Sequence, residues 1–333
     1  MSRYRRRLRW NRIFAVIIAG GLVATAAYLV QDSFHTLFPS AAEESQAEES
    51  VQESAVTEST VTESSEVSEA EQFLPEGWKW INLSKEKLHQ GELILVNNQT
   101  AFEGEAPETV SIYDVKTASY QVKDTLVTIQ EKVAEQLNAM LDDFYAKTGL
   151  SDVMIISGWR GVDKQDTLYQ DDLLETGQNS STLVAKPGYS EHHTGLALDL
   201  GLLPEIEGVG RSYDGQGAYS WINENCGEYG FILRYPEDKM AETGIEYEPW
   251  HFRYVGTPHS QIIMEKGICL EEYLEFLKEY PVNGTHYETD TYEICWQEAQ
   301  ETPQGDYRVA VPENGDYTTS GDNMGGVIVT IQK

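Results

Sequence analysis

Residues 190–199 read SEHHTGLALD, and residues 248–251 read EPWH. They contain His192, Asp199 and His251, and two imidazoles with one carboxylate form a donor set that zinc takes in catalytic sites, where a fourth position is left for water. A glycine lies between the first two ligands, so a loop that turns into a strand would bring both to one cleft. The third would join from a neighbouring strand. The two stretches therefore predict a metal site together with the sheet that carries it.

A base for the attacking water is predicted three residues before His251. If the chain bends at Pro249, the Glu248 carboxylate reaches the metal-activated water, takes its proton and passes that proton to the leaving amine. Glu246 competes for this role. Arg160 follows a short apolar stretch and is a cation that would stabilise the oxyanion developing on the attacked carbonyl. Spacing alone leaves a purely structural E-x-x-H pair as the alternative.

Three linked motifs resemble the VanY-type D-alanyl-D-alanine carboxypeptidases, which are zinc peptidases that share a fold with the lysostaphin and hedgehog-type groups. The family pattern S-x-H-x-x-G-x-A-x-D stands at residues 190–199, and the pattern around the second histidine stands as EPWHFRYVG at 248–256. The turn S-G-[WY]-R stands as SGWR at 157–160, and GFILRYP at 230–236 also looks like the family. The resemblance covers residues 75–280.

The resemblance implies roles for a small set of side chains. The implied zinc ligands are His192, Asp199 and His251, and the implied general base is Glu248. The implied cation that stabilises the oxyanion and orients the substrate is Arg160. The implied contacts to the substrate are Ser190, Gln165 and Tyr169. His193 would point away from its neighbour along an extended chain, so we place it outside the site.

The implied activity is removal of the terminal D-Ala from peptidoglycan stem peptides that end in D-Ala-D-Ala. The bond that is cut stays open at this point, because relatives of the same fold are L,D-carboxypeptidases or endopeptidases that cut within the stem or the cross-bridge. A non-enzymatic module that binds the cell wall is a third alternative, against which the intact ligands and base argue.

The remaining pattern predicts an α+β fold with a small antiparallel sheet, flanking helices and a small C-terminal β module. Helices are expected where apolar residues recur at three- and four-residue steps, and strands where short apolar or alternating runs end at turn residues. The expected helices span 124–147, 162–175, 218–229, 259–266 and 270–279. The expected strands span 92–96, 153–156, 196–202, 231–233, 247–254, 287–298, 306–311 and 327–331.

Four segments are expected along the chain. Residues 1–40 include an uncharged apolar run at 13–30 that follows six Arg, which predicts a membrane anchor with the N-terminus in the cytoplasm and the rest outside. A cleaved signal peptide is the alternative. Residues 41–72 carry ten Glu and no basic residue, which predicts an extended, disordered tether. A zinc peptidase domain over 73–281 and the β module over 282–333 follow.

The net charge of the chain is -31, which argues against nucleic acid as a partner because two polyanions repel each other. Three cysteines are too few for a disulfide scaffold. Cys226 and Cys269 lie in apolar contexts, where buried and inert thiols are the default. Four histidines lack partners in a metal-ligand pattern and are expected as surface or capping residues: His35, His89, His259 and His286.

Overall fold

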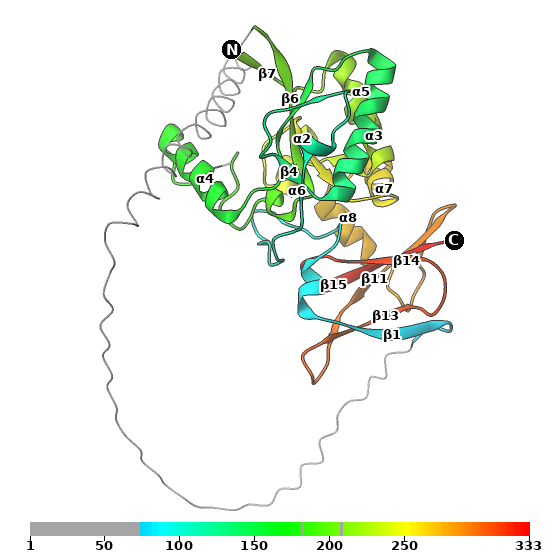
Figure 1. The fold of residues 1–333 in the computed structure, drawn as a ribbon. Helices are drawn as coiled ribbons and strands as arrows, with labels where there is room; N and C mark the ends of the chain where they lie inside the picture. The colour runs from blue at the N-terminus through cyan, green and yellow to red at the C-terminus, as the bar shows by residue number, and fades with distance from the viewer. Residues whose placement is uncertain (1–73, 182, 207–208) are drawn as a thin grey trace, which may run out of the picture. The chain divides into compact units, whose positions relative to one another are not determined.

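The structure is a computed structural model that describes residues 74–181, 183–206 and 209–333 (Figure 1). One of its sheets has six strands in the order β3-β5-β6-β9-β8, with β7 paired to β6. Neighbouring strands are antiparallel except for β3 and β5. The strands are β3 Gln121–Val122, β5 Val153–Ser157, β6 Ala197–Ile206, β7 Val209–Ser212, β8 Phe231–Leu233 and β9 His251–Tyr254. This sheet and the helices around it confirm the predicted α+β class.

Helix α3, Glu131–Thr148, packs one apolar face into the cluster that also contains the buried leucines of β6. The helix ends at Gly149, which adopts a left-handed backbone with φ of 73°. The buried side chains of this face recur at three- and four-residue steps, as the sequence predicts: Val133, Ala134, Leu137, Met140, Leu141 and Phe144.

The predicted start of this helix at residue 124 is wrong. Thr128–Ile129 forms the short strand β4, which pairs with β2, Val110–Ser111. Leu126, which fitted the helical spacing, is 79% exposed. The run Thr125–Ile129 is rich in β-branched residues, which favour an extended chain over a helix. The apolar spacing of this segment therefore coincided with the helical period without producing a helix.

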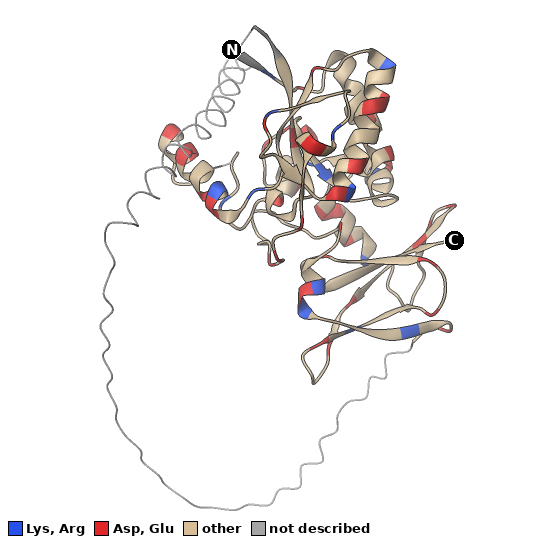
Figure 2. Ribbon diagram, viewed as in Figure 1, with Lys and Arg blue, Asp and Glu red and all other residues tan. Residues whose placement is uncertain are grey.

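The remaining helices are α2 Ile112–Val115, α4 Val162–Thr176, α5 Ser220–Asn225, α6 Met240–Thr243, α7 His259–Lys266 and α8 Leu270–Leu277. Helices α4, α7 and α8 confirm the predicted helices to within two residues at each end. Helix α5 is shorter than the predicted helix because both of its flanks tighten into 3-10 turns. Acidic positions occur along α3 and α4 (Figure 2), in keeping with the acidic composition of the chain.

Two further sheets form the C-terminal β module, in the orders β10-β11-β15-β14 and β1-β13-β12. Strand β1 comes from the N-terminal end of the described chain and pairs antiparallel with β13 over its full length (Figure 1). The predicted module at 282–333 is therefore joined by a strand that lies before it in the sequence. The strands are β1 Trp78–Leu83, β10 Tyr287–Glu288, β11 Tyr292–Glu298, β12 Gln300–Glu301, β13 Tyr307–Pro312, β14 Tyr317–Gly321 and β15 Gly326–Gln332.

The strand expected at 92–96 is not a strand. The segment is a buried connection whose backbone bonds to the β module. The Leu93 N–H donates to Ser320 Oγ at 2.9 Å, and the Leu95 N–H donates to the Asp322 carbonyl at 3.1 Å. The apolar residues of this segment are buried as a strand's would be, but these backbone N–H groups bond to one hydroxyl and one loop carbonyl, and backbone carbonyls of the segment accept from the Arg253 and Asn323 side chains rather than from a neighbouring strand.

Within the described part of the chain, no helix has the length and apolar character needed to cross a membrane. The predicted anchor at 13–30 and the predicted tether at 41–72 lie outside the described residues. The three cysteines are free and buried, and burial raises the pKa of Cys226 and of Cys269 to about 12. The prediction that both thiols are buried is confirmed, and a raised pKa keeps a thiol in its less reactive protonated form.

His259 is 5% exposed, so its expected place on the surface or in a cap is wrong. Its Nδ1 lies 2.7 Å from the Tyr273 hydroxyl, and its Nε2 lies 3.0 Å from the Thr330 hydroxyl. The ring therefore links α7 to α8 and to β15. Burial lowers the pKa of His259 to about 3, because a charged imidazole would lose its hydration without gaining an opposite charge.

This burial predicts a loss of stability in mild acid. Below the ordinary histidine pKa of about 6.5, the His259 imidazole is protonated in the unfolded chain but stays neutral in the folded chain. The free energy of unfolding therefore falls as the pH drops toward the pKa of the folded state. Between pH 7 and pH 5 we expect the His259 contribution to the free energy of unfolding to fall by about 2 kcal/mol. Urea unfolding at both pH values should show a smaller drop for His259→Gln than for the unchanged protein. An equal drop in the two proteins would contradict the prediction.

Candidate active site

The turn that carries His192 is fixed by its own sequence. Glu191–Thr194 forms a 3-10 turn, and the His192 N–H donates to the Oγ of the capping residue Ser190 at 3.4 Å. Gly195 ends the turn in left-handed backbone with φ of 65°, and the chain then enters β6. Ser190, predicted to contact the substrate, is 5% exposed and serves here as the cap of the turn.

Strands β6 and β9 bring the other two candidate ligands together. Asp199 lies directly opposite His251 in the antiparallel register, and opposite residues share one face of a sheet. The strand predicted at 247–254 begins only at His251, because the preceding residues form a turn in which the His251 N–H donates to the Glu248 carbonyl at 3.2 Å. The chain therefore bends at Pro249, as the predicted approach of Glu248 to the metal requires.

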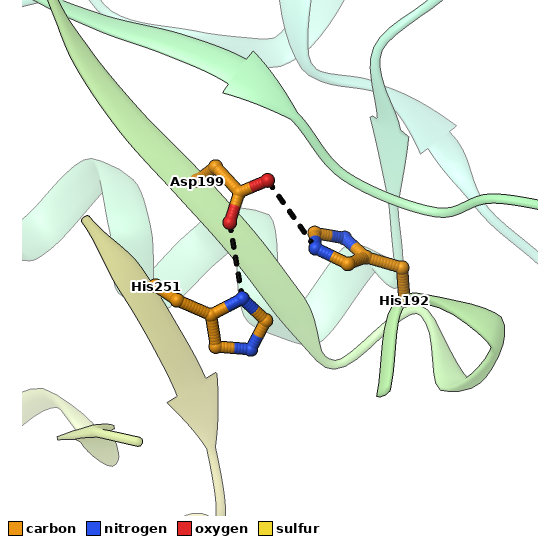
Figure 3. A group of neighbouring side chains, drawn as sticks. All are labelled: His192, Asp199 and His251. Atoms are coloured by element: carbon orange, nitrogen blue, oxygen red, sulfur yellow. Dashed lines mark hydrogen bonds and ion pairs between the residues drawn. The ribbon is translucent and has the colours of Figure 1, made fainter. Parts of the chain in front are cut away.

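His192, Asp199 and His251 form a compact candidate metal centre (Figure 3). One potential ligand atom from each residue lies within 4.8 Å of the other two. Asp199 Oδ2 is 3.3 Å from His192 Nε2, and Asp199 Oδ1 is 3.0 Å from His251 Nδ1. All three residues are buried. Two nitrogens and one carboxylate oxygen fit a zinc ion that keeps one coordination position free.

Contacts outside the centre determine which nitrogen of each imidazole faces it. His192 Nδ1 lies 2.6 Å from the Gly158 carbonyl, so its N–H donates there and Nε2 faces Asp199. His251 Nε2 lies 3.3 Å from Glu191 Oε2, so Nδ1 faces Asp199. Outer hydrogen bonds of this kind orient the histidine ligands of metal sites.

The charges around the centre suit a divalent cation. Burial and the nearby Arg160 charge lower the pKa of His192 to about 4, so this ring is neutral at pH 7. Burial alone would raise the pKa of Asp199, but His192 and His251 outweigh it, and the pKa lies well below its ordinary value. Burial lowers the pKa of His251, while hydrogen bonds to Asp199 and Glu191 outweigh that effect and raise it to about 9. A bound metal would take the place of the proton on His251.

Glu248 lies beside this centre. Its side chain is 9% exposed, and its Oε2 is 3.9 Å from His251 Nδ1. Its N–H donates to the Tyr235 carbonyl at 3.1 Å, which ties the turn to the chain that follows β8. Burial raises the pKa of Glu248 to about 8, although the neighbouring His251 opposes this shift. The carboxylate occupies a position from which it can reach a molecule bound at the metal donors.

Arg160 is anchored by three hydrogen bonds. Its Nε donates to Ser157 Oγ at 3.2 Å, Nη1 to Gln165 Oε1 at 2.9 Å, and Nη2 to Asp199 Oδ2 at 3.2 Å. Each Nη carries a second N–H beyond these bonds. The Arg160 side chain is 17% exposed, which leaves room for a ligand at the centre to approach it.

Gln165 and Tyr169, the other two predicted substrate contacts, lie one turn apart on α4. Gln165 is 1% exposed, and its Nε2 donates to the Ala185 carbonyl at 2.7 Å while its Oε1 accepts from Arg160. Both ends of this amide are therefore used within the protein, and the residue positions Arg160. Tyr169 is half-buried, and its contact with substrate stays a prediction.

The sequence reasoning missed a group of buried charges behind His251. Glu191, Arg234 and Arg253 have side chains that are 0% exposed, and both arginines lie 2.8 Å from Glu191 Oε1. A signal was available, because each arginine sits next to an apolar strand segment, Phe231–Leu233 or Phe252 with Tyr254. A charge in such a segment needs a buried partner of opposite sign. His193 lies outside the centre as predicted, with its Nδ1 2.7 Å from the Arg160 carbonyl, but it lies on a 3-10 turn and not on the extended chain from which this was inferred.

Comparison with known proteins places these features in a family. The sequence profile of the VanY family, described as D-alanyl-D-alanine carboxypeptidase, matches residues 127–257. The chain is 37% identical over 253 residues to a D-alanyl-D-alanine carboxypeptidase of Enterococcus faecium, covering 75% of this chain and 78% of that one. It is 41% identical over 155 residues to a bifunctional D-Ala-D-Ala dipeptidase and D-Ala-D-Ala carboxypeptidase of Enterococcus gallinarum, covering 45% and 80%.

A solved structure resembles the fold as well. The vancomycin-resistance D,D-dipeptidase VanXYg, in complex with a D-Ala-D-Ala phosphinate analogue, superposes with a TM-score of 0.66 and 32% identity, covering 77% of this chain and 99% of that one. The matched profile includes all eight residues to which the sequence assigned a role. The chain belongs to the VanY family of D-alanyl-D-alanine carboxypeptidases.

Proposed function

We propose that this chain is a zinc-dependent D,D-carboxypeptidase that removes the terminal D-Ala from peptidoglycan stem peptides. The observation that carries the proposal is the buried donor set of His192, Asp199 and His251 with Glu248 beside it. The substrate class is supported by the name of the Enterococcus faecium relative and by the D-Ala-D-Ala phosphinate analogue in the solved relative. Bound zinc supplies a Lewis acid that activates water and polarises the scissile carbonyl.

The proton and the developing charge are handled by two residues of this chain. Glu248 takes a proton from the attacking water and gives it to the amine nitrogen of the leaving D-Ala. The C–N bond breaks, and the products are the shortened stem peptide and D-alanine. Arg160 offers its remaining Nη–H groups to the substrate oxygen that becomes negative, while Gln165 and Asp199 hold the guanidinium in place. Among the described residues, the side chains of Ser190 and Gln165 form hydrogen bonds within the protein, whereas none is found for the Tyr169 side chain. Tyr169 therefore stays the predicted substrate contact.

We also propose that the catalytic part works outside the cell, attached to the membrane through residues 13–30. The support is the sequence alone, which has six Arg before an uncharged apolar run and an acidic stretch at 41–72 after it. Membrane fractionation tests the anchor, because an integral protein stays in the pellet after alkaline extraction and a secreted one appears in the medium. Digestion of intact cells with an added protease tests on which side the catalytic part lies.

Two relatives carry dipeptidase in their names, which favours cleavage of free D-Ala-D-Ala as a second candidate activity. Mass spectrometry after incubation with a stem pentapeptide, a stem tetrapeptide, a cross-linked dimer and free D-Ala-D-Ala separates the alternatives. Loss of one alanine from the pentapeptide alone supports the D,D-carboxypeptidase. Shortening of the tetrapeptide would indicate an L,D-carboxypeptidase, and cleavage of the dimer an endopeptidase. Absence of any cleavage by the zinc-loaded protein would leave a wall-binding module.

Glu248→Gln should abolish most of the activity and leave the metal in place. Removal of a general acid–base group costs about 10²–10⁴ in rate, and the substitution leaves all three candidate ligands intact. We expect kcat on the pentapeptide to fall by about this factor, with zinc content measured by elemental analysis unchanged. Glu246→Gln is the matched control, since Glu246 is exposed and two residues away. Full activity of Glu248→Gln, or an equal loss in the control, would show that the base has been misassigned.

His251→Ala should remove the zinc. Three protein ligands become two, because the position opposite Asp199 loses its imidazole. We expect the purified variant to contain less than about one tenth of the zinc of the unchanged protein after dialysis. His193→Gln is the control, because His193 contacts backbone groups away from the centre. Equal zinc in the His251→Ala variant and the unchanged protein would place the metal elsewhere.

A further inference from the structure

A buried carboxylate lies between one candidate metal ligand and two buried arginines. Glu191 Oε2 is 3.3 Å from His251 Nε2, on the side of the imidazole that faces away from Asp199. Glu191 Oε1 accepts from Arg234 Nε and from Arg253 Nη1, each at 2.8 Å. The two oxygens of this carboxylate therefore have separate tasks, one toward the arginines and one toward the imidazole.

The arginines keep Glu191 ionised and fixed. The other two nitrogens of Arg234 donate hydrogen bonds to Glu271, Nη1 to Oε2 at 2.8 Å and Nη2 to Oε1 at 2.6 Å. Arg253 donates to the backbone carbonyls of Glu92 and Ile94 at 2.9 Å and 2.8 Å. A buried charge without partners would be strongly destabilising, whereas here each one is paired and hydrogen-bonded. Two cations on Oε1 thus stabilise the anionic form of Glu191.

An ionised carboxylate only accepts hydrogen bonds, so the His251 nitrogen that faces it carries the proton. Because Nε2 keeps its proton, the proton that a metal would displace is the one on Nδ1, which lies 3.0 Å from Asp199 Oδ1, and the lone pair that becomes available is on Nδ1. His192 is arranged the other way round, since its Nδ1 faces the Gly158 carbonyl and its Nε2 faces Asp199. The two imidazoles therefore present different nitrogens to the same centre.

We propose that Glu191 is a positioning residue for the metal centre, which fixes the tautomer of His251 so that Nδ1 is the ligand. Arg234 and Arg253 keep Glu191 in place from the other side. The inference rests on the proposed zinc function and deepens it, because it names the side chain that makes the third ligand competent. A carboxylate that served only to neutralise the arginines would not need to direct its second oxygen at the imidazole.

Glu191→Gln tests this with little change in shape. The amide oxygen of the new side chain stays toward the two arginines, since an NH₂ group there would face two donors. The NH₂ group then faces His251 Nε2 and can only donate, which favours the tautomer with the proton on Nδ1. The lone pair needed by the metal is lost. We expect zinc affinity, measured by competition with a chromogenic chelator, to fall about 10–100-fold.

Glu271→Gln is the matched control. It removes the same charge from a carboxylate bonded to the same arginine, Arg234, and no hydrogen bond joins Glu271 to His251 among the described residues. We expect its zinc affinity to stay within about threefold of the unchanged protein, as for a group one step removed from the ligands. An unchanged affinity in Glu191→Gln, or the same loss in both variants, would overturn the proposal.

A second measurement does not depend on whether Glu191→Gln folds. Nitrogen-15 NMR of the unchanged, zinc-loaded protein with labelled histidine reports which nitrogen of each ring is protonated. We expect the proton on Nε2 of His251 and on Nδ1 of His192. A proton on Nδ1 of His251 would overturn the inference and leave the zinc function standing. Failure of the unchanged protein to bind zinc would instead remove the proposed function itself.

Discussion

The contact between Asp199 and His251 is the constraint on which the site depends. The two residues face each other across β6 and β9, with 3.0 Å between Oδ1 and Nδ1, so the backbone register sets the distance between two candidate ligands. A shift of either strand by one residue would turn one of the side chains to the other face of the sheet. The register is held by apolar packing, because Leu198, Leu200 and Phe252 belong to the same buried cluster as α3. His192 then needs only a short capped turn before β6 to complete the set.

The β module supports this arrangement through a series of backbone contacts. Asn323, with a left-handed φ of 65°, donates its amide to the carbonyls of Leu95 and Ala101 at 2.8 Å and 2.7 Å. One residue further along, the Phe102 N–H donates to the Gly188 carbonyl at 2.8 Å, just before the turn that carries His192. The module, completed by β1, thus fixes a segment that is hydrogen-bonded to the chain just before the Glu191–Thr194 turn. This gives residues 282–333 a structural task that their sequence does not reveal.

Buried charge is concentrated behind the metal donors. The Tyr235 ring lies 4.9 Å from the His251 ring and 4.9 Å from the Arg234 guanidinium, so one aromatic side chain packs beside both the centre and the charges that support it. A buried ring among these groups lowers the local dielectric and strengthens the electrostatic interactions of the carboxylates with a cation. Beside these buried groups, the Arg160 side chain is 17% exposed, so its cationic group can be reached from solvent.

The sequence by itself determined the ligand types, the α+β class and the long, strongly periodic elements such as α4, α7 and α8. These features depend on residue chemistry and on spacing within one segment, which a linear pattern contains. It misplaced the start of α3 and the strand at 92–96, because apolar spacing does not say which backbone groups will be the partners. Only the tertiary structure revealed that β1 pairs with β13 and that Glu191 forms ion pairs with Arg234 and Arg253. It also showed that Ser190 caps the turn of His192 and that Gln165 holds Arg160 in place. Those contacts link residues far apart in the chain, and their energy depends on burial and charge pairing that exist only once the chain has folded.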